Sequence, residues 1–176
     1  EFVTMVKALA PVVDMLEINL SCPNIPGKPQ VAYDFEASLD ILLTLRGITD
    51  KPIGVKLPAY LDPVFQKQMA EVLLQANVDF ISLINSLGHT IFIDGEETCI
   101  HPNSGRGGLG GEFIKPVALG QVNAFYSLLG DQIPIFGVGG ISSGHDVYDY
   151  VLAGASGVQV GTAYSIGGIP VLNEIC

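Results

Sequence analysis

Short apolar runs alternate with longer amphipathic stretches along most of this 176-residue chain. The apolar runs have the length and composition of buried strands, while the stretches between them repeat their apolar residues with helical spacing. The predicted strands are Leu16–Ser21, Pro52–Leu57, Phe80–Asn85, Ile133–Val138 and Gly157–Val160. The predicted helices are Phe2–Leu9, Phe35–Arg46, Pro63–Gln75, Phe113–Leu129 and His145–Ala153.

Residues at the predicted element ends agree with this pattern. Gly47 follows the second predicted helix as a stop signal, and Asp62 precedes the third as an N-cap. The alternation then breaks at Asp94-Gly95, a pair that favours a tight turn between extended segments. A hairpin is therefore predicted between Thr90–Ile93 and Glu97–Ile100.

Repeated strand and helix units with apolar strands predict a parallel sheet covered by helices, either doubly wound or closed into a barrel. The barrel is favoured because polar residues and glycines follow the predicted strands, at the end where (β/α)8 barrels place their active sites. These positions are Asn19–Asn24, Lys56, Asn85-Ser86, Gly139-Gly140 and Gly161-Thr162. A complete barrel needs roughly 250 residues. We therefore expect an α/β fold of the TIM-barrel type, present over residues 1–176 as one partial domain that covers about strands 4 to 8 and lacks the N-terminal strands.

Composition narrows the possible functions. A hydrophobic content of 48% can support a sizeable core, and a net charge of −10 disfavours a surface for nucleic acid or an anionic membrane. The three cysteines form no C-x-x-C pair, so neither a disulfide framework nor a zinc or other metal site is expected, and a reducing cytoplasm fits. No apolar run reaches the length of about eighteen residues that predicts a membrane span.

The segment after the first predicted strand concentrates polar side chains in a rigid loop. Three prolines and a glycine between residues 23 and 29 prevent a strand or helix from continuing through it. Two amides, a hydroxyl and a thiol occur within six positions, from Asn19, Asn24, Ser21 and Cys22. Such a group suits a planar polar ligand that needs several hydrogen bonds.

The run Asn19-Leu20-Ser21-Cys22-Pro23-Asn24, continued by Pro26-Gly27-Lys28-Pro29-Gln30, resembles the active-site loop of the dihydroorotate dehydrogenases, specifically the soluble, fumarate-using class 1A. This resemblance implies FMN-dependent oxidation of dihydroorotate to orotate in pyrimidine (UMP) biosynthesis. It also implies that fumarate accepts the electrons and becomes succinate, and that the enzyme is a cytoplasmic homodimer. A serine in place of Cys22 would instead resemble the membrane-bound, quinone-using class.

The resemblance also implies a role for individual residues. Cys22 falls at the family's catalytic base, and Lys56 falls at the lysine beside the flavin ring, where a cation stabilises the reduced flavin. The residues expected to hold the pyrimidine ring are Asn19, Asn24, Asn85 and Ser86. The residues expected to bind FMN, besides Lys56, are Gly110, Gly111, Gly139, Gly140, Gly161 and Thr162. The helix beginning near residue 143 is expected to assist the two glycine turns in binding the FMN phosphate.

Without the resemblance, these residues have plainer interpretations. A lone cysteine such as Cys22 is more often an inert small hydrophobe, and Lys56 could extend to the surface from its strand end. Asn85 could only cap a turn, and Gly107–Gly111 has the composition of a flexible loop. The histidines of the region, His89 and His101, are expected to be solvated.

Alternative functions follow from these interpretations. One is another FMN- or phosphate-binding barrel enzyme, such as a dihydropyrimidine dehydrogenase-like domain or a sugar-phosphate lyase. The other is an inactive fragment of a barrel. The segments Leu87–Thr90 and Tyr164–Cys176 depart from the family's pattern.

Overall fold

A five-stranded parallel sheet forms the centre of the computed structural model, which describes residues 1–22 and 29–176. Its strands pair in chain order: β1 (Leu16–Asn19), β2 (Ile53–Leu57), β3 (Phe80–Leu83), β8 (Ile135–Val138) and β9 (Gly157–Gln159). All five were predicted from the apolar runs. Each is shorter than its predicted run by one or two residues: β1, β3 and β9 end earlier, whereas β2 and β8 begin later, after Pro52 and Pro134.

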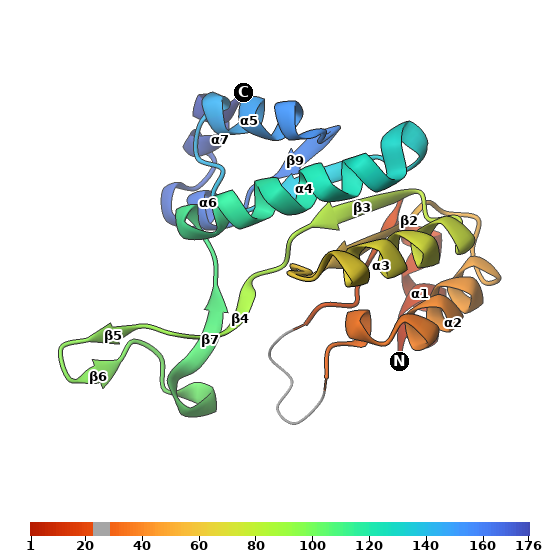
Figure 1. The fold of residues 1–176 in the computed structure, drawn as a ribbon, viewed down its shortest axis with the longest axis horizontal. Helices are drawn as coiled ribbons and strands as arrows, with labels where there is room; N and C mark the ends of the chain where they lie inside the picture. Colours follow the sequence, from red (N-terminus) through yellow and green to blue (C-terminus); the bar gives the residue numbers. More distant parts are fainter. Residues whose placement is uncertain (23–28) are drawn as a thin grey trace.

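Seven α-helices lie before, between and after these strands in the described residues (Figure 1). They are α1 (Phe2–Leu9), α2 (Phe35–Arg46), α3 (Pro63–Gln75), α4 (Lys115–Leu129), α5 (Gly144–Ala153), α6 (Thr162–Gly167) and α7 (Pro170–Ile175). Short 3-10 segments occur at Ala10–Val12, Val31–Tyr33, Pro102–Gly105, Glu112–Ile114 and Gly130–Gln132. The first five helices confirm the prediction, whereas α6 and α7 were not predicted.

The bounds of α1, α2 and α3 match the prediction, and side-chain caps fix the start of two of these helices, α2 and α3. The Asp34 carboxylate accepts a hydrogen bond from the Ala37 backbone N–H at 3.0 Å and begins α2. The Asp62 carboxylate likewise accepts from the Val64 N–H at 2.8 Å and begins α3. Each cap satisfies an N–H group that the first helical turn leaves unpaired.

The strand order supports a barrel rather than a doubly wound sheet. A doubly wound sheet reverses its strand order and places helices on both faces, whereas right-handed crossovers in unbroken order place every helix on one face. The sheet is also strongly curled, since the side chains of Glu17 in β1 and Gln159 in β9 meet at 2.6 Å although these are its two outer strands. In a flat sheet, four spacings of about 4.8 Å would separate those strands. The fold is therefore consistent with part of a TIM-barrel-type protein.

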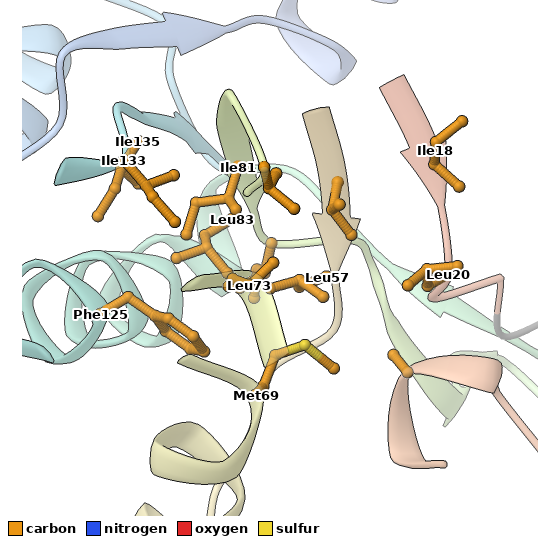
Figure 2. Close-up of a cluster of buried hydrophobic side chains, with 14 of the residues drawn as sticks. Ile18, Leu20, Leu57, Met69, Leu73, Ile81, Leu83, Phe125, Ile133 and Ile135 are labelled. Carbon is orange, nitrogen blue, oxygen red and sulfur yellow. The ribbon is translucent and has the colours of Figure 1, made fainter. Parts of the chain in front are cut away.

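The hydrophobic core lies between the sheet and the helices. In Figure 2, Ile18, Leu57 and Leu83 from the strands lie in one cluster with Met69, Leu73 and Phe125 from the helices. Met69, Leu73, Leu57, Leu83 and Phe125 have no exposed surface. Burial of a side chain of this size stabilises the fold by about 1.5–3 kcal/mol, so this layer holds the strands in place.

The region between β3 and α4 forms a separate arm (Figure 1). β4 (Leu87–Ile91) pairs antiparallel with β7 (Arg106–Leu109), and the hairpin of β5 (Ile93–Asp94) and β6 (Glu97–Thr98) extends from that pair. The predicted hairpin is present, but its expected extent was wrong, since Thr90 and Ile91 pair with β7 instead. The expectation of a flexible loop over the glycine run was also wrong, because β4 supplies hydrogen-bonding partners that no local pattern reveals.

Candidate functional site

The inner face of the curled sheet is built from every second residue of each strand. At its lower level, the rings of Phe80 and Phe136 meet edge to face with centroids 5.4 Å apart. Each ring lies opposite a glycine on the neighbouring strand, Gly54 and Gly157 respectively. A Cβ at Gly54 would lie 2.1 Å from the Phe80 ring, so only glycine leaves room for this layer.

A polar network lies directly above the aromatic layer. The Glu17 carboxylate accepts hydrogen bonds from the Ser82 hydroxyl at 2.5 Å and from the Gln159 amide at 2.6 Å. The Gln159 amide oxygen accepts from the Lys56 ammonium at 3.2 Å, and the ammonium lies 3.9 Å from Glu17 Oε1. Four strands, β1, β2, β3 and β9, therefore contribute to one charged network on the inner face of the sheet.

A second set of hydrogen bonds joins the carboxyl ends of β1 and β3. The Asn19 side-chain oxygen accepts from the Ser21 N–H and hydroxyl, both at 3.0 Å. The Asn85 amide donates to the Ser21 carbonyl at 3.0 Å and to Asn19 Oδ1 at 3.3 Å. Ser21 is buried, with only 1% of its surface exposed. The chain is therefore anchored immediately before Cys22.

A cavity of about 570 Å³ opens at this end of the sheet. Its polar lining includes Lys56, Asn85, Ser86, Ser142, Gln159 and Thr162. Its apolar lining includes Ile84, Phe113, Ile114, Val138, Ile141 and Ile166. Five glycines also line the cavity: Gly110, Gly111, Gly139, Gly140 and Gly161. The volume is in the range of about 300–1,000 Å³ that small-molecule sites occupy.

Three glycine segments meet at one side of the cavity. A Cβ built on Gly140 would lie 2.7 Å from Lys115 Cβ and 2.9 Å from the backbone of Glu112, and the residue has a φ of +69°. The Gly139-Gly140 turn is also held by a hydrogen bond, because the buried Tyr150 hydroxyl donates to the Gly139 carbonyl at 2.6 Å. Burial raises the pKa of Tyr150 well above its ordinary value, so this hydroxyl keeps its proton.

The beginning of α5 is already occupied by a side chain of its own. The Asp146 carboxylate accepts from the Ser142 and Ser143 N–H groups, both at 2.9 Å, and from Lys115 at 2.5 Å. Burial alone would raise the pKa of Asp146, but the hydrogen bonds from Lys115, Ser142 and Ser143 outweigh it and hold this pKa well below its usual range. Asp146 therefore already occupies these two N–H groups, and assistance to a phosphate from the rest of this helix start stays a prediction.

The structure brings together most of the residues singled out in the sequence. Those that line the cavity are Lys56, Asn85, Ser86, Gly110, Gly111, Gly139, Gly140, Gly161 and Thr162. Asn19 reaches the cavity wall through its hydrogen bond to Asn85. Cys22 is exposed and is not among the lining residues, and Asn24 lies outside the described residues. His89 and His101 are exposed, as expected.

Three residues of the network were missed in the sequence. Ser82 and Gln159 are each the single polar residue of an otherwise apolar strand, and Glu17 shares β1 with Asn19. A polar residue within an apolar strand was the signal that could have identified them, because a charged or amide side chain inside a buried strand requires a polar partner. In the described part of the chain, no group of three or more His, Cys, Asp and Glu side chains is arranged to hold a metal ion. No helix among the described residues has the length and apolarity needed to cross a bilayer.

The model of the family described as dihydroorotate dehydrogenase matches residues 1–176. The chain belongs to this family. It is similar to a probable dihydroorotate dehydrogenase A (fumarate) of Streptococcus pneumoniae serotype 4, with 45% identity over 161 residues, and to a putative one of Streptococcus uberis at the same identity. A putative dihydroorotate dehydrogenase A (fumarate) of Streptococcus pyogenes serotype M5 is 44% identical.

The alignments with these dihydroorotate dehydrogenases cover 92% of the chain and 52% of each relative. The chain thus spans about half the length of the curated relatives it matches. Membership of the dihydroorotate dehydrogenase family confirms the resemblance seen in the loop after the first strand.

Proposed function

We propose that this chain is part of an enzyme that oxidises dihydroorotate to orotate with FMN, in pyrimidine biosynthesis, and returns the electrons to fumarate. One observation carries the proposal: Lys56, the Asn85-Ser86 pair and all three glycine segments line a single cavity at the carboxyl ends of the strands. These are the chemical groups that a flavin phosphate, a flavin ring and a pyrimidine would each need. The relatives named as fumarate-using enzymes support the choice of acceptor.

The lining residues fit FMN. The glycine turns have backbone N–H groups without side chains in the way, and the hydroxyl group of Thr162 lies in the same wall, which suits a phosphate. Ile84, Phe113 and Ile141 offer apolar surface to a flat ring. Lys56 lies on the floor of the cavity, where its ammonium would face the ring edge that becomes negative. When bound, FMN would supply the hydride acceptor.

The polar groups of β1 and β3 would hold the substrate. Asn85 and Ser86 line the cavity and Asn19 is hydrogen-bonded to Asn85, so donors and acceptors converge at one edge. In the proposal, these residues and Asn24 bind the pyrimidine ring, since an amide can pair with an imide by donating and accepting at once. Cys22 would take the C5 proton as the C6 hydride leaves. Its position one residue after the anchored Ser21 supports this assignment.

The remaining parts of the proposal concern the whole protein. We propose that residues 1–176 form one partial domain supplying about strands 4 to 8 of the barrel. In the described residues, β1 and β9 each pair on one side only, and three further strands would close the sheet between them. We further propose a homodimer in the cytoplasm. The 176-residue chain alone is expected to bind FMN weakly and to be inactive, because the strands that would complete the wall are absent from it.

The test is to mix the complete protein with FMN, dihydroorotate and fumarate, and to follow the formation of orotate by its absorbance. Stoichiometric FMN binding with orotate and succinate formed in equal amounts would support the proposal. Flavin binding without orotate would favour another FMN-dependent barrel enzyme. A protein that binds a sugar phosphate but no flavin would contradict the proposal.

A further inference from the structure

The network on the floor of the cavity contains a carboxylate that the proposed mechanism does not use. Glu17 comes from β1, and the Glu17 and Lys56 side chains are only 27% and 22% exposed. Placing a charged carboxylate inside a barrel is costly unless partners compensate for lost water. Here the partners are Ser82, Gln159 and Lys56, which together occupy both carboxylate oxygens. The arrangement connects Glu17 to Lys56, the one lysine that lines the cavity among residues 1–22 and 29–176.

The charge of Glu17 determines which way the Gln159 amide faces. A carboxylate only accepts hydrogen bonds, so the NH2 group of Gln159 must turn toward it, and this group also lies 2.9 Å from the Ser82 hydroxyl. The amide oxygen is then left facing the Lys56 ammonium at 3.2 Å. Glu17 thus acts on Lys56 twice, directly as a counter-ion and through the orientation of Gln159.

We infer that Glu17 is a positioning residue that restrains Lys56 at the floor of the cavity and offsets part of its charge, and so sets the reduction potential of the bound flavin. This inference rests on the proposed function, in which Lys56 faces the flavin. A free ammonium would stabilise the negative charge of a reduced flavin more strongly than one paired with a carboxylate. Glu17 therefore keeps the potential lower than Lys56 alone would set it.

The first experiment uses the complete protein without flavin. Glu17→Gln keeps the shape of the side chain but removes its charge, and acetylation of Lys56 by acetic anhydride is followed by peptide mass spectrometry. We expect acetylation to be at least threefold faster in the variant, because the amine loses the ion pair with the carboxylate that restrains it against the wall of the cavity. The matched control is Glu71→Gln, an exposed glutamate of α3. Equal Lys56 acetylation in the two variants would overturn the inference.

The second experiment measures the flavin reduction potential of the same proteins by equilibration with redox dyes. At a fixed ambient potential we expect Glu17→Gln to hold at least a tenfold higher ratio of reduced to oxidised flavin than wild type, or about 30 mV for a two-electron couple. Lys56→Gln should shift the ratio in the opposite direction. A Glu17→Gln potential equal to that of Glu71→Gln, or lower than wild type, would overturn the inference.

These outcomes can be separated from a failure of the proposed function. If wild type binds no FMN, the proposed function fails at that step, whereas a flavin-loaded wild type with an unaltered Glu17→Gln potential contradicts the inference alone. If Glu17→Gln does not fold, Gln159→Leu removes the bridging amide and retains the carboxylate. Lys56 acetylation in Gln159→Leu is then expected to rise at least twofold, and an unchanged rate would overturn the inference.

Discussion

The two faces of the five-stranded sheet are formed by alternate residues of the same strands, yet they carry different side chains. In β3, Ile81 and Leu83 belong to the hydrophobic core beneath the helices, while Ser82 lies between them in the polar network. In β2, Val55 and Leu57 belong to that core, and Lys56 points the other way. All four of these core residues have no exposed surface.

Neighbouring residues of one strand therefore have different roles: those facing the helices stabilise the fold, and those on the inner face form the candidate site. The helix-facing side chains need only be apolar and of suitable size, so many combinations of apolar residues could fill these positions. The inner face must instead satisfy each polar group with a named partner, as Glu17 does with Ser82 and Gln159. Substitutions on the first face should therefore change the free energy of unfolding, and those on the second should change binding and catalysis.

The largest effect is expected for Leu83→Ala on the helix-facing side. Removing a fully buried leucine side chain from a packed core should lower the free energy of unfolding by about 2–5 kcal/mol. The neighbouring change Ser82→Ala removes two hydrogen bonds on the inner face and should cost only about 1 kcal/mol. Urea unfolding of both variants measures the contrast, and equal losses would mean that the two faces are not distinct.

Cys22→Ala should have the largest effect on chemistry. Loss of a general base is expected to slow flavin reduction by dihydroorotate about a hundredfold or more, as measured by stopped flow on the complete protein. FMN binding should be unchanged, because Cys22 does not line the cavity. The matched control is Cys99→Ala, which removes an exposed thiol of the arm and should leave the rate as it is. A wild-type rate in Cys22→Ala would contradict the assignment.

Gly140→Ala is expected to weaken FMN binding about tenfold, or about 1.4 kcal/mol. The added methyl group would lie within 3 Å of the Glu112 backbone at a φ of +69°, so the turn must shift. Fluorescence titration of FMN gives the affinity. Gly120→Ala is the control, since a Cβ there meets nothing within 4 Å, and in the interior of α4 it should stabilise the helix by about 0.5–1 kcal/mol. Similar FMN affinities in the two variants would argue against the glycine turn as a binding element.

Asp146→Asn should have the smallest effect, and one that depends on pH. Because the folded pKa of Asp146 is depressed, its stabilisation is fully present above the unfolded value of about 3.9 and is lost as the pH falls toward the folded value. The variant should therefore be about 1 kcal/mol less stable than wild type at pH 7, and this gap should narrow between about pH 4 and pH 2. Urea unfolding across this range checks it, and a constant gap would contradict the role of the carboxylate.

Sequence reasoning succeeded where local signals decide structure. The bounds of α2 and α3 followed from the helical spacing of their apolar residues, with Gly47 as a stop signal and Asp62 as an N-cap, since such signals act on nearby residues alone. The order of the strands followed from their apolar runs. The loop after β1 could be interpreted as a binding or catalytic segment because Asn19, Ser21 and Cys22 stand close together in the chain.

Sequence reasoning failed where the residues that pair or hydrogen-bond are distant in the chain. β7 is a glycine-rich strand that exists only because β4 pairs with it. Glu17 and Gln159 are separated by 142 positions, and only the curl of the sheet brings them to 2.6 Å. The hydrogen bond from Lys115 to Asp146 was likewise unpredictable, since Lys115 reaches it from α4, whereas the capping box of Ser143 and Asp146 is local.

The most direct test of the account is hydrogen–deuterium exchange of the complete protein with and without FMN. If the open end of the inner face binds the cofactor, exchange should slow at residues 139–141 and 161–163, which line the cavity, and stay unchanged in α2 and α3 on the covered face. Protection confined to the helices, or no protection at either glycine turn when FMN is bound, would contradict it.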